Sequence, residues 1–164
     1  MVTLRCTQKL LQRLGAAADA RPGPPTTVLG DWYASILHRR PQQLVICMNE
    51  RTLLVVLIPA REIKSMGERF REAAIAQLRR IGVAPAAIEA EAQAMSDVAF
   101  GPTASRSILG CLREATFSLS IELEHPRYST LPEIEDYLGK NIYSTTKYRR
   151  PREHALELLG YRRT

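Results

Sequence analysis

A turn between two expected elements carries the first group of residues that could bind an anion. Its polar side chains are Thr103, Ser105, Arg106 and Ser107. The turn leads from a short apolar stretch into a helical pattern, and free backbone N–H groups at a helix start favour an anion. The hydroxyls can donate to that anion, and the guanidinium fork of Arg106 can bind phosphate or carboxylate. The alternative is a helix cap, with Arg106 paired to a carboxylate such as Asp97.

The second group is a basic segment at the end of the chain, residues 139–164. It holds seven Lys and Arg against two Asp and Glu, whereas residues 1–138 hold 16 against 15. Such a segment can steer a polyanion such as nucleic acid, or an acidic protein surface. The side chains expected at phosphates are Lys147, Arg149, Arg150 and Arg152. The alternative is a solvated face whose neighbouring tyrosines pack on the body of the protein.

A third group lies in a polar turn between two apolar runs. The turn spans residues 49–52, and it can present Asn49 and Arg51 to a ligand. Polar residues at such a position are also what a plain hairpin turn requires. The sequence therefore offers Asn49 and Arg51 as surface candidates, with a purely structural turn as the alternative.

The cysteines and histidines show no spacing that indicates a metal site. They are Cys6, Cys47 and Cys111, and His38, His125 and His154. Each cysteine lies in an apolar context, where a thiol behaves as a small hydrophobic side chain. No phosphate-binding glycine loop and no nucleophile motif is present. We therefore expect no metal and no cofactor, and the sequence leaves open whether the protein is an enzyme.

The elements that position these groups can be predicted from hydrophobic periodicity. We expect strands at residues 2–6, 44–49, 53–58 and 97–101. The second and third are near-continuous apolar runs joined by the 49–52 turn, so they should form an antiparallel hairpin at the centre of the sheet, covered on both faces. The Pro-rich stretch 16–27 should be a surface loop.

Seven helices are expected, because apolar residues recur at helical spacing or follow capping signals. Their predicted ranges are 7–14, 31–37, 61–81, 84–95, 104–124, 131–138 and a last helix from residue 151. In the range 104–124 the last part is ambiguous, since residues 117–124 also alternate as a strand would. The predicted fold is a single α+β domain, residues 1–164, with a small antiparallel sheet covered by helices.

Length and composition limit the class of protein. The chain has 164 residues, 45% hydrophobic and 24% charged, which is typical of one globular domain. No apolar run is long enough for a membrane helix, and no signal-peptide pattern is present. We expect a cytoplasmic protein of unassigned oligomeric state that does not engage a membrane.

Several stretches together resemble a small family of bacterial proteins catalogued as a domain of unknown function. They are Leu4–Leu11, Leu29–Ala34, Met48–Leu54, Pro59–Arg61 and Pro102–Gly110, with a weaker similarity at Tyr148–Glu153. In the family pattern an Asn more often precedes the Arg-Ser pair, and here the residue is Ser105. The resemblance implies a bacterial α+β domain and carries no activity.

Three functions are consistent with these observations. The first is a non-catalytic binding or regulatory protein that contacts nucleic acid through the basic C-terminal segment. The second is a protein-interaction partner, for example in a toxin–antitoxin or phage-related system, which would expose an apolar patch. The third is a small enzyme or a binder of a phosphate-bearing ligand, centred on Arg106.

Overall fold

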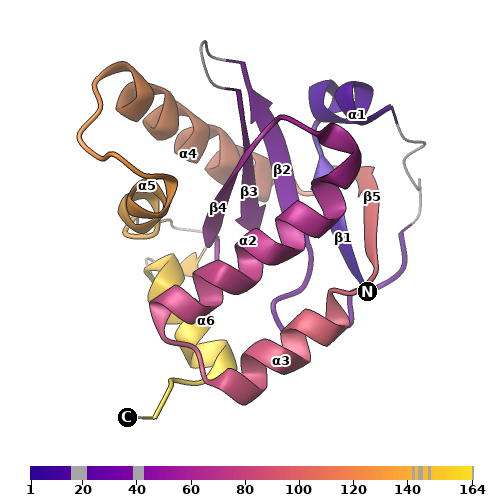
Figure 1. Ribbon diagram of the computed structural model, residues 1–164, viewed down its shortest axis with the longest axis vertical. Coiled ribbons are helices and arrows are strands. Elements are labelled where there is room, and N and C mark those ends of the chain that lie inside the picture. Colours follow the sequence, from indigo (N-terminus) through magenta and orange to yellow (C-terminus); the bar gives the residue numbers. More distant parts are fainter. Residues whose placement is uncertain (16–21, 39–42, 142, 144–145, 148, 164) are drawn as a thin grey trace.

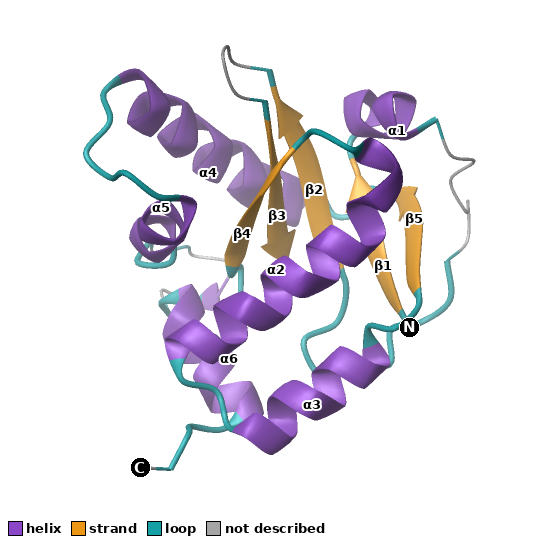
Figure 2. Cartoon of the chain, in the orientation of Figure 1, coloured by secondary structure: helices purple, strands orange, loops and turns teal. Residues whose placement is uncertain are grey.

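A five-stranded sheet with helices on both faces organises the chain (Figures 1 and 2). The computed structural model describes residues 1–15, 22–38, 43–141, 143, 146–147 and 149–163. Part of the expected 16–27 loop, residues 16–21, lies outside the described residues, and so does Tyr148. The predicted α+β fold is confirmed.

The strands are β1 (Val2–Cys6), β2 (Trp32–Leu37), β3 (Leu44–Asn49), β4 (Val55–Pro59) and β5 (Val98–Pro102). Their order in the sheet is β4-β3-β2-β1-β5. β1 runs parallel to β2 and β5, while β2–β3 and β3–β4 are antiparallel. The sheet is therefore mixed rather than antiparallel, and the β3–β4 hairpin occupies one side of it rather than the centre.

The helices are α1 (Gln8–Leu14), η1 (Ile63–Ser65), α2 (Met66–Ile81), α3 (Pro85–Ala94), α4 (Arg106–Glu124), α5 (Leu131–Leu138) and α6 (Pro151–Leu159). One core lies between the sheet and α1, α2, α3 and α6, and a second lies between the sheet and α4 and α5. Both faces of β3 and β4 are buried, as their apolar runs predict. In the described part of the chain, each helix is too short or too polar to cross a bilayer.

The segment 31–37 was expected to be a helix, and that expectation is wrong. It forms β2, in which Trp32 and Tyr33 point to opposite faces of the sheet and enter different cores. Trp32 meets the ring of Phe70 edge-on at 5.5 Å between centroids. Asp31 resembles a helix cap in the sequence, but its carboxylate accepts the backbone N–H of Thr3 on the neighbouring strand. Because both faces of β2 are buried, its apolar residues fall at positions that resemble the spacing of a helix.

The ambiguous segment 117–124 is the continuation of α4. Leu119 is fully buried against the sheet, whereas Phe117 is 67% and Ile121 is 44% exposed. The alternation that imitated a strand therefore comes from two apolar side chains on the outer face of the helix.

The outer edge of β4 is closed by two helices. The N–H of Leu57 donates to the buried carboxylate of Glu135 on α5 at 2.8 Å, and Gln77 on α2 donates to the carbonyl of Val55 at 3.4 Å. Arg80 bonds to both Gln77 and Glu135 and so links the two helices. These bonds satisfy backbone groups that an open sheet edge would present to other chains.

Candidate functional site

The turn after β5 is built as a helix cap. The Ser105 hydroxyl accepts the backbone N–H of Ile108 at 3.3 Å, and the Ser105 N–H donates to the Tyr33 hydroxyl at 3.0 Å. Tyr33 lies on β2, so this contact fixes the start of α4 against the sheet. Ser105 therefore serves the fold in the way that the capping alternative predicts.

The other polar side chains of this turn lie at the surface. Arg106 and Ser107 are exposed at the start of α4, and Thr103 is partly exposed. Arg106 forms no ion pair with Asp97, nor with any other residue that the structure describes. The structure thus brings the predicted anion-binding residues to one turn, where helix capping already accounts for the arrangement of Ser105.

The 49–52 turn is built around a buried amide. Asn49 was expected at the surface, but it is fully buried, which corrects that expectation. Its side-chain N–H groups donate to the carbonyls of Leu29 and Asp31, and its side-chain oxygen accepts the backbone N–H groups of Arg51 and Thr52 and the Thr52 hydroxyl. Arg51 is exposed, and its guanidinium donates to a backbone carbonyl. This turn is therefore structural.

A buried carboxylate joins the same turn to the first strand. Asp31 accepts the N–H of Thr3 at 2.9 Å and forms an ion pair with Arg5 at 3.3 Å. Glu50 accepts the N–H of Asp31 at 2.8 Å. Gly30 has a φ of +76°, and a Cβ there would lie 2.4 Å from the Glu50 carboxylate, so a larger residue would strain the backbone and displace Glu50. These polar groups bond to one another inside the protein and leave few donors or acceptors for a ligand.

The three cysteines are buried, and none of them is in a disulfide. Burial raises the pKa of the Cys6 thiol to about 12, and burial, with smaller contributions from Cys6 and Glu135, raises the pKa of Cys47 well above its ordinary value. A thiol with a raised pKa is protonated at neutral pH and is a poor nucleophile and metal ligand. Burial therefore favours a packing role for Cys6 and Cys47.

The basic C-terminal segment lies on the body of the protein where it is described. Tyr143 is buried in the core under α4 and α5, while Ala155 and Leu156 of α6 enter the other core. Beyond α6, Tyr161 forms a bridge with Val83. The segment is thus held against the body at several points, and its charged side chains lie at the surface.

The four predicted phosphate contacts are all exposed. They are Lys147, Arg149, Arg150 and Arg152, at or next to the start of α6. Arg149 forms an ion pair with Glu157 at 2.7 Å, with both side chains about half exposed. An exposed pair of this kind contributes little stability and yields readily to a competing anion. The structure therefore presents these cations to solvent around one end of one helix.

A shallow hollow of about 240 Å³ lies within this basic surface. It is lined by Thr146, Lys147, Arg149 and His154. Burial, helped by Arg149, lowers the pKa of His154, so the imidazole is neutral at pH 7. The positive charge at the hollow therefore comes from Lys147 and Arg149 rather than from the histidine.

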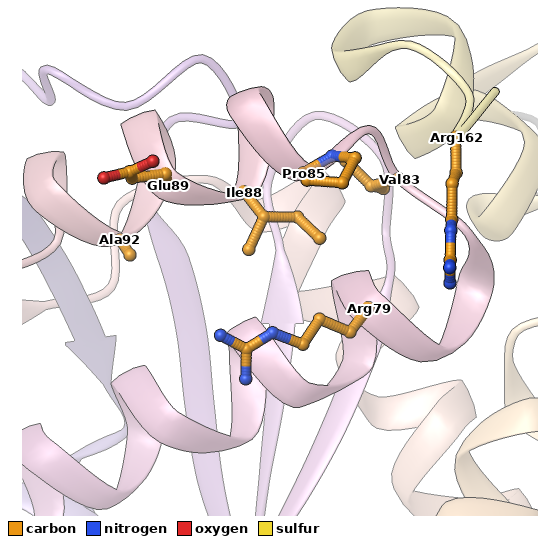
Figure 3. Close-up of a pocket in the computed structure, with 7 residues that line it drawn as sticks. All are labelled: Arg79, Val83, Pro85, Ile88, Glu89, Ala92 and Arg162. Atoms are coloured by element: carbon orange, nitrogen blue, oxygen red, sulfur yellow. The ribbon is translucent and has the colours of Figure 1, made fainter.

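Two further cations are brought together that the sequence analysis did not connect. The backbone N–H of Arg162 donates to the carbonyl of Gly82 at 2.7 Å, just after the last turn of α2, which contains Arg79. Both arginines line a larger hollow of about 540 Å³ (Figure 3). No local pattern in the sequence predicts that these two arginines line the same hollow, because their positions depend on the Val83–Tyr161 bridge between segments 78 residues apart.

A comparison with known proteins identifies the family of this chain. The sequence matches the family described as "Domain of unknown function (DUF6933)" over residues 3–154. No curated protein and no solved structure matches the chain. The matched range includes the sheet except for Val2, the 49–52 turn and the four exposed cations at the start of α6. Because the match spans most of the chain, the protein belongs to the DUF6933 family.

Proposed function

We propose that this protein is a non-catalytic nucleic-acid-binding protein whose binding surface is the basic segment around the start of α6. The observation that carries the proposal is the joint exposure of Lys147, Arg149, Arg150 and Arg152 on a segment held against the body. The rest of the chain is nearly balanced in charge, with 16 basic and 15 acidic residues in 1–138. The positive field is therefore local, as expected of a surface that contacts a polyanion.

Several features support binding rather than chemistry as the role. Glu91 and Glu135 have pKa values raised by burial, and each accepts backbone N–H groups that hold separate elements together. Raised carboxyl pKa values also occur in active sites, but these two groups are already used by the fold. The proposal takes the protein to be cytoplasmic, where both nucleic acid and reduced cysteines are expected.

The test is fluorescence anisotropy with a labelled 12-nucleotide strand of mixed sequence and its duplex. In one variant Lys147, Arg149, Arg150 and Arg152 are all changed to Gln. We expect its affinity to fall by about 30-fold at moderate salt, because four phosphate contacts and their released counterions are lost.

A matched variant controls for net charge. It changes four exposed cations elsewhere on the chain to Gln, namely Lys9, Arg13, Arg61 and Arg113. Both variants remove the same charge, so the control should lose less than about threefold in affinity if the α6 surface is the binding site. Equal losses in the two variants would reject a defined surface there.

A second candidate function is protein interaction through α4. Phe117 and Ile121 are exposed one helical turn apart, and they are the two large apolar side chains on the outer face of that helix. A complex recovered through this face would survive 0.5 M NaCl and be lost when both residues are changed to Ser. A complex that salt dissociates would instead favour the basic surface.

A further inference from the structure

The larger hollow lies between α2, α3 and the end of the chain (Figure 3). Its walls are Val83, Pro85, Ile88 and Ala92, with Arg79, Glu89 and Arg162 at the margins. In Figure 3, Arg162 stands at the end near Pro85 and Val83, Glu89 lies toward the opposite end, and Ile88 points down between them. A volume of about 540 Å³ is in the range of sites for small organic groups.

The charged groups around this hollow are not used by the fold. Among the described residues, neither Arg79 nor Arg162 has a hydrogen bond or ion pair through its guanidinium, and the same holds for the Glu89 carboxylate. By contrast, Arg80 forms an ion pair with Glu135, and Arg127 forms one with Glu122. Two guanidiniums beside an apolar wall match a group that has an apolar face and adjacent negative charge.

Helix α6 connects the proposed binding surface at its start to the hollow beyond its end. Arg162 follows α6, and Arg150 precedes it. The nine residues of α6 span about 13 Å at 1.5 Å per residue. A bound strand that occupies several nucleotides, as is usual for single-strand-binding grooves, is long enough to contact both ends.

From these observations we infer that the hollow receives one unstacked base of a single-stranded nucleic acid, with its neighbouring phosphates on Arg79 and Arg162. This inference rests on the proposed function and narrows its ligand to single-stranded nucleic acid. A base has an apolar face of the kind that Ile88 and Pro85 offer, whereas a duplex keeps its bases stacked inside. The protein should therefore prefer single strands to duplexes.

Glu89 adds a preference among bases. A carboxylate near the base edge accepts a hydrogen bond from an exocyclic amino group, which cytosine has and thymine lacks. We expect a (dC)12 strand to bind more tightly than (dT)12, and Glu89→Ala to remove the difference. A preference for (dT)12 would contradict this placement of the base.

The decisive experiment compares strand and duplex binding for the wild type and three variants by anisotropy at one salt concentration. The strand should bind about tenfold more tightly than the duplex, which corresponds to about 1.4 kcal/mol for the base held in the hollow. Arg79→Gln and Ala92→Leu, which fills the hollow without changing charge, should each remove most of this advantage and leave duplex affinity within twofold. Arg13→Gln, an exposed arginine in the last turn of α1, should change neither affinity.

The outcomes separate the two proposals. Equal wild-type affinity for strand and duplex, or equal effects of Arg79→Gln on both, would overturn the base-binding hollow while leaving the α6 surface in place. Failure of the wild type to bind either probe at low salt would overturn the proposed function itself. Circular dichroism of each variant confirms that it is folded.

Discussion

Replacing Asn49 with alanine should lower the free energy of unfolding by about 4 kcal/mol, because it leaves several buried polar groups unpaired at once. The amide is fully buried and bridges the loop before β2 to the turn after β3. Each buried group without a partner costs about 1–3 kcal/mol. Leu53, directly after the turn, has a φ of 62°, a strained conformation that the bonds of the turn help to hold.

Urea unfolding followed by far-UV circular dichroism measures this effect. Gln43→Ala, just before the start of the same strand, is the matched control, since it truncates an amide side chain that is partly exposed. The control should change stability by less than about 0.5 kcal/mol. A loss of under about 1 kcal/mol for Asn49→Ala would show that solvent or rearrangement replaces the network.

The second large effect is expected at the edge of β4. Glu135→Ala removes the acceptor for the Leu57 N–H and the partner of Arg80, so it should cost about 3 kcal/mol at pH 7. Glu135→Gln keeps an oxygen for Leu57 and should cost less than about 1 kcal/mol. Equal losses in the two variants would mean that the hydrogen bond to β4 contributes little.

The same carboxyl predicts a pH dependence. Burial raises the pKa of Glu135 above its ordinary value of 4.5, although the Leu57 N–H and Arg80 oppose the shift. A raised folded pKa stabilises the protein fully below the unfolded value, and that contribution is lost as the pH rises through the folded pKa. The stability of the wild type relative to Glu135→Gln should therefore fall between pH 4.5 and neutrality. A rise over that interval, measured by thermal unfolding, would contradict the burial argument.

The sequence was sufficient for much of the secondary structure. The helix around Phe70 and Leu78 was predicted because its buried residues recur every three or four positions, and its packing requires that spacing. The range 31–37 was misread because Trp32 and Tyr33 enter cores on opposite faces of the sheet, and burial on both faces removes the alternation that marks a strand. The parallel pairing of β1 with β2 and β5 depends on long-range register, which no local pattern encodes.

The sequence located some candidate-site residues and misplaced others, because contacts between distant segments leave no local pattern. The basic residues at the start of α6 could be identified because their charges are close together in the sequence. Asn49 was placed at the surface because a polar turn residue is usually exposed, whereas its partners Leu29 and Asp31 lie some 20 positions away. That Arg79 and Arg162 line one hollow could be seen only in the fold, since the Val83–Tyr161 bridge and neighbouring backbone hydrogen bonds bring residues 160–162 to the end of α2.

The measurement that tests nucleic-acid binding most directly is the salt dependence of wild-type affinity for the 12-nucleotide single strand. Four phosphate contacts at Lys147, Arg149, Arg150 and Arg152 predict that log K falls with log[salt] at a slope of about −3. Contacts at Arg79 and Arg162 would steepen it to about −4. A slope near zero, or no binding at 50 mM salt, would contradict the account and leave the exposed face of α4 as the surface to pursue.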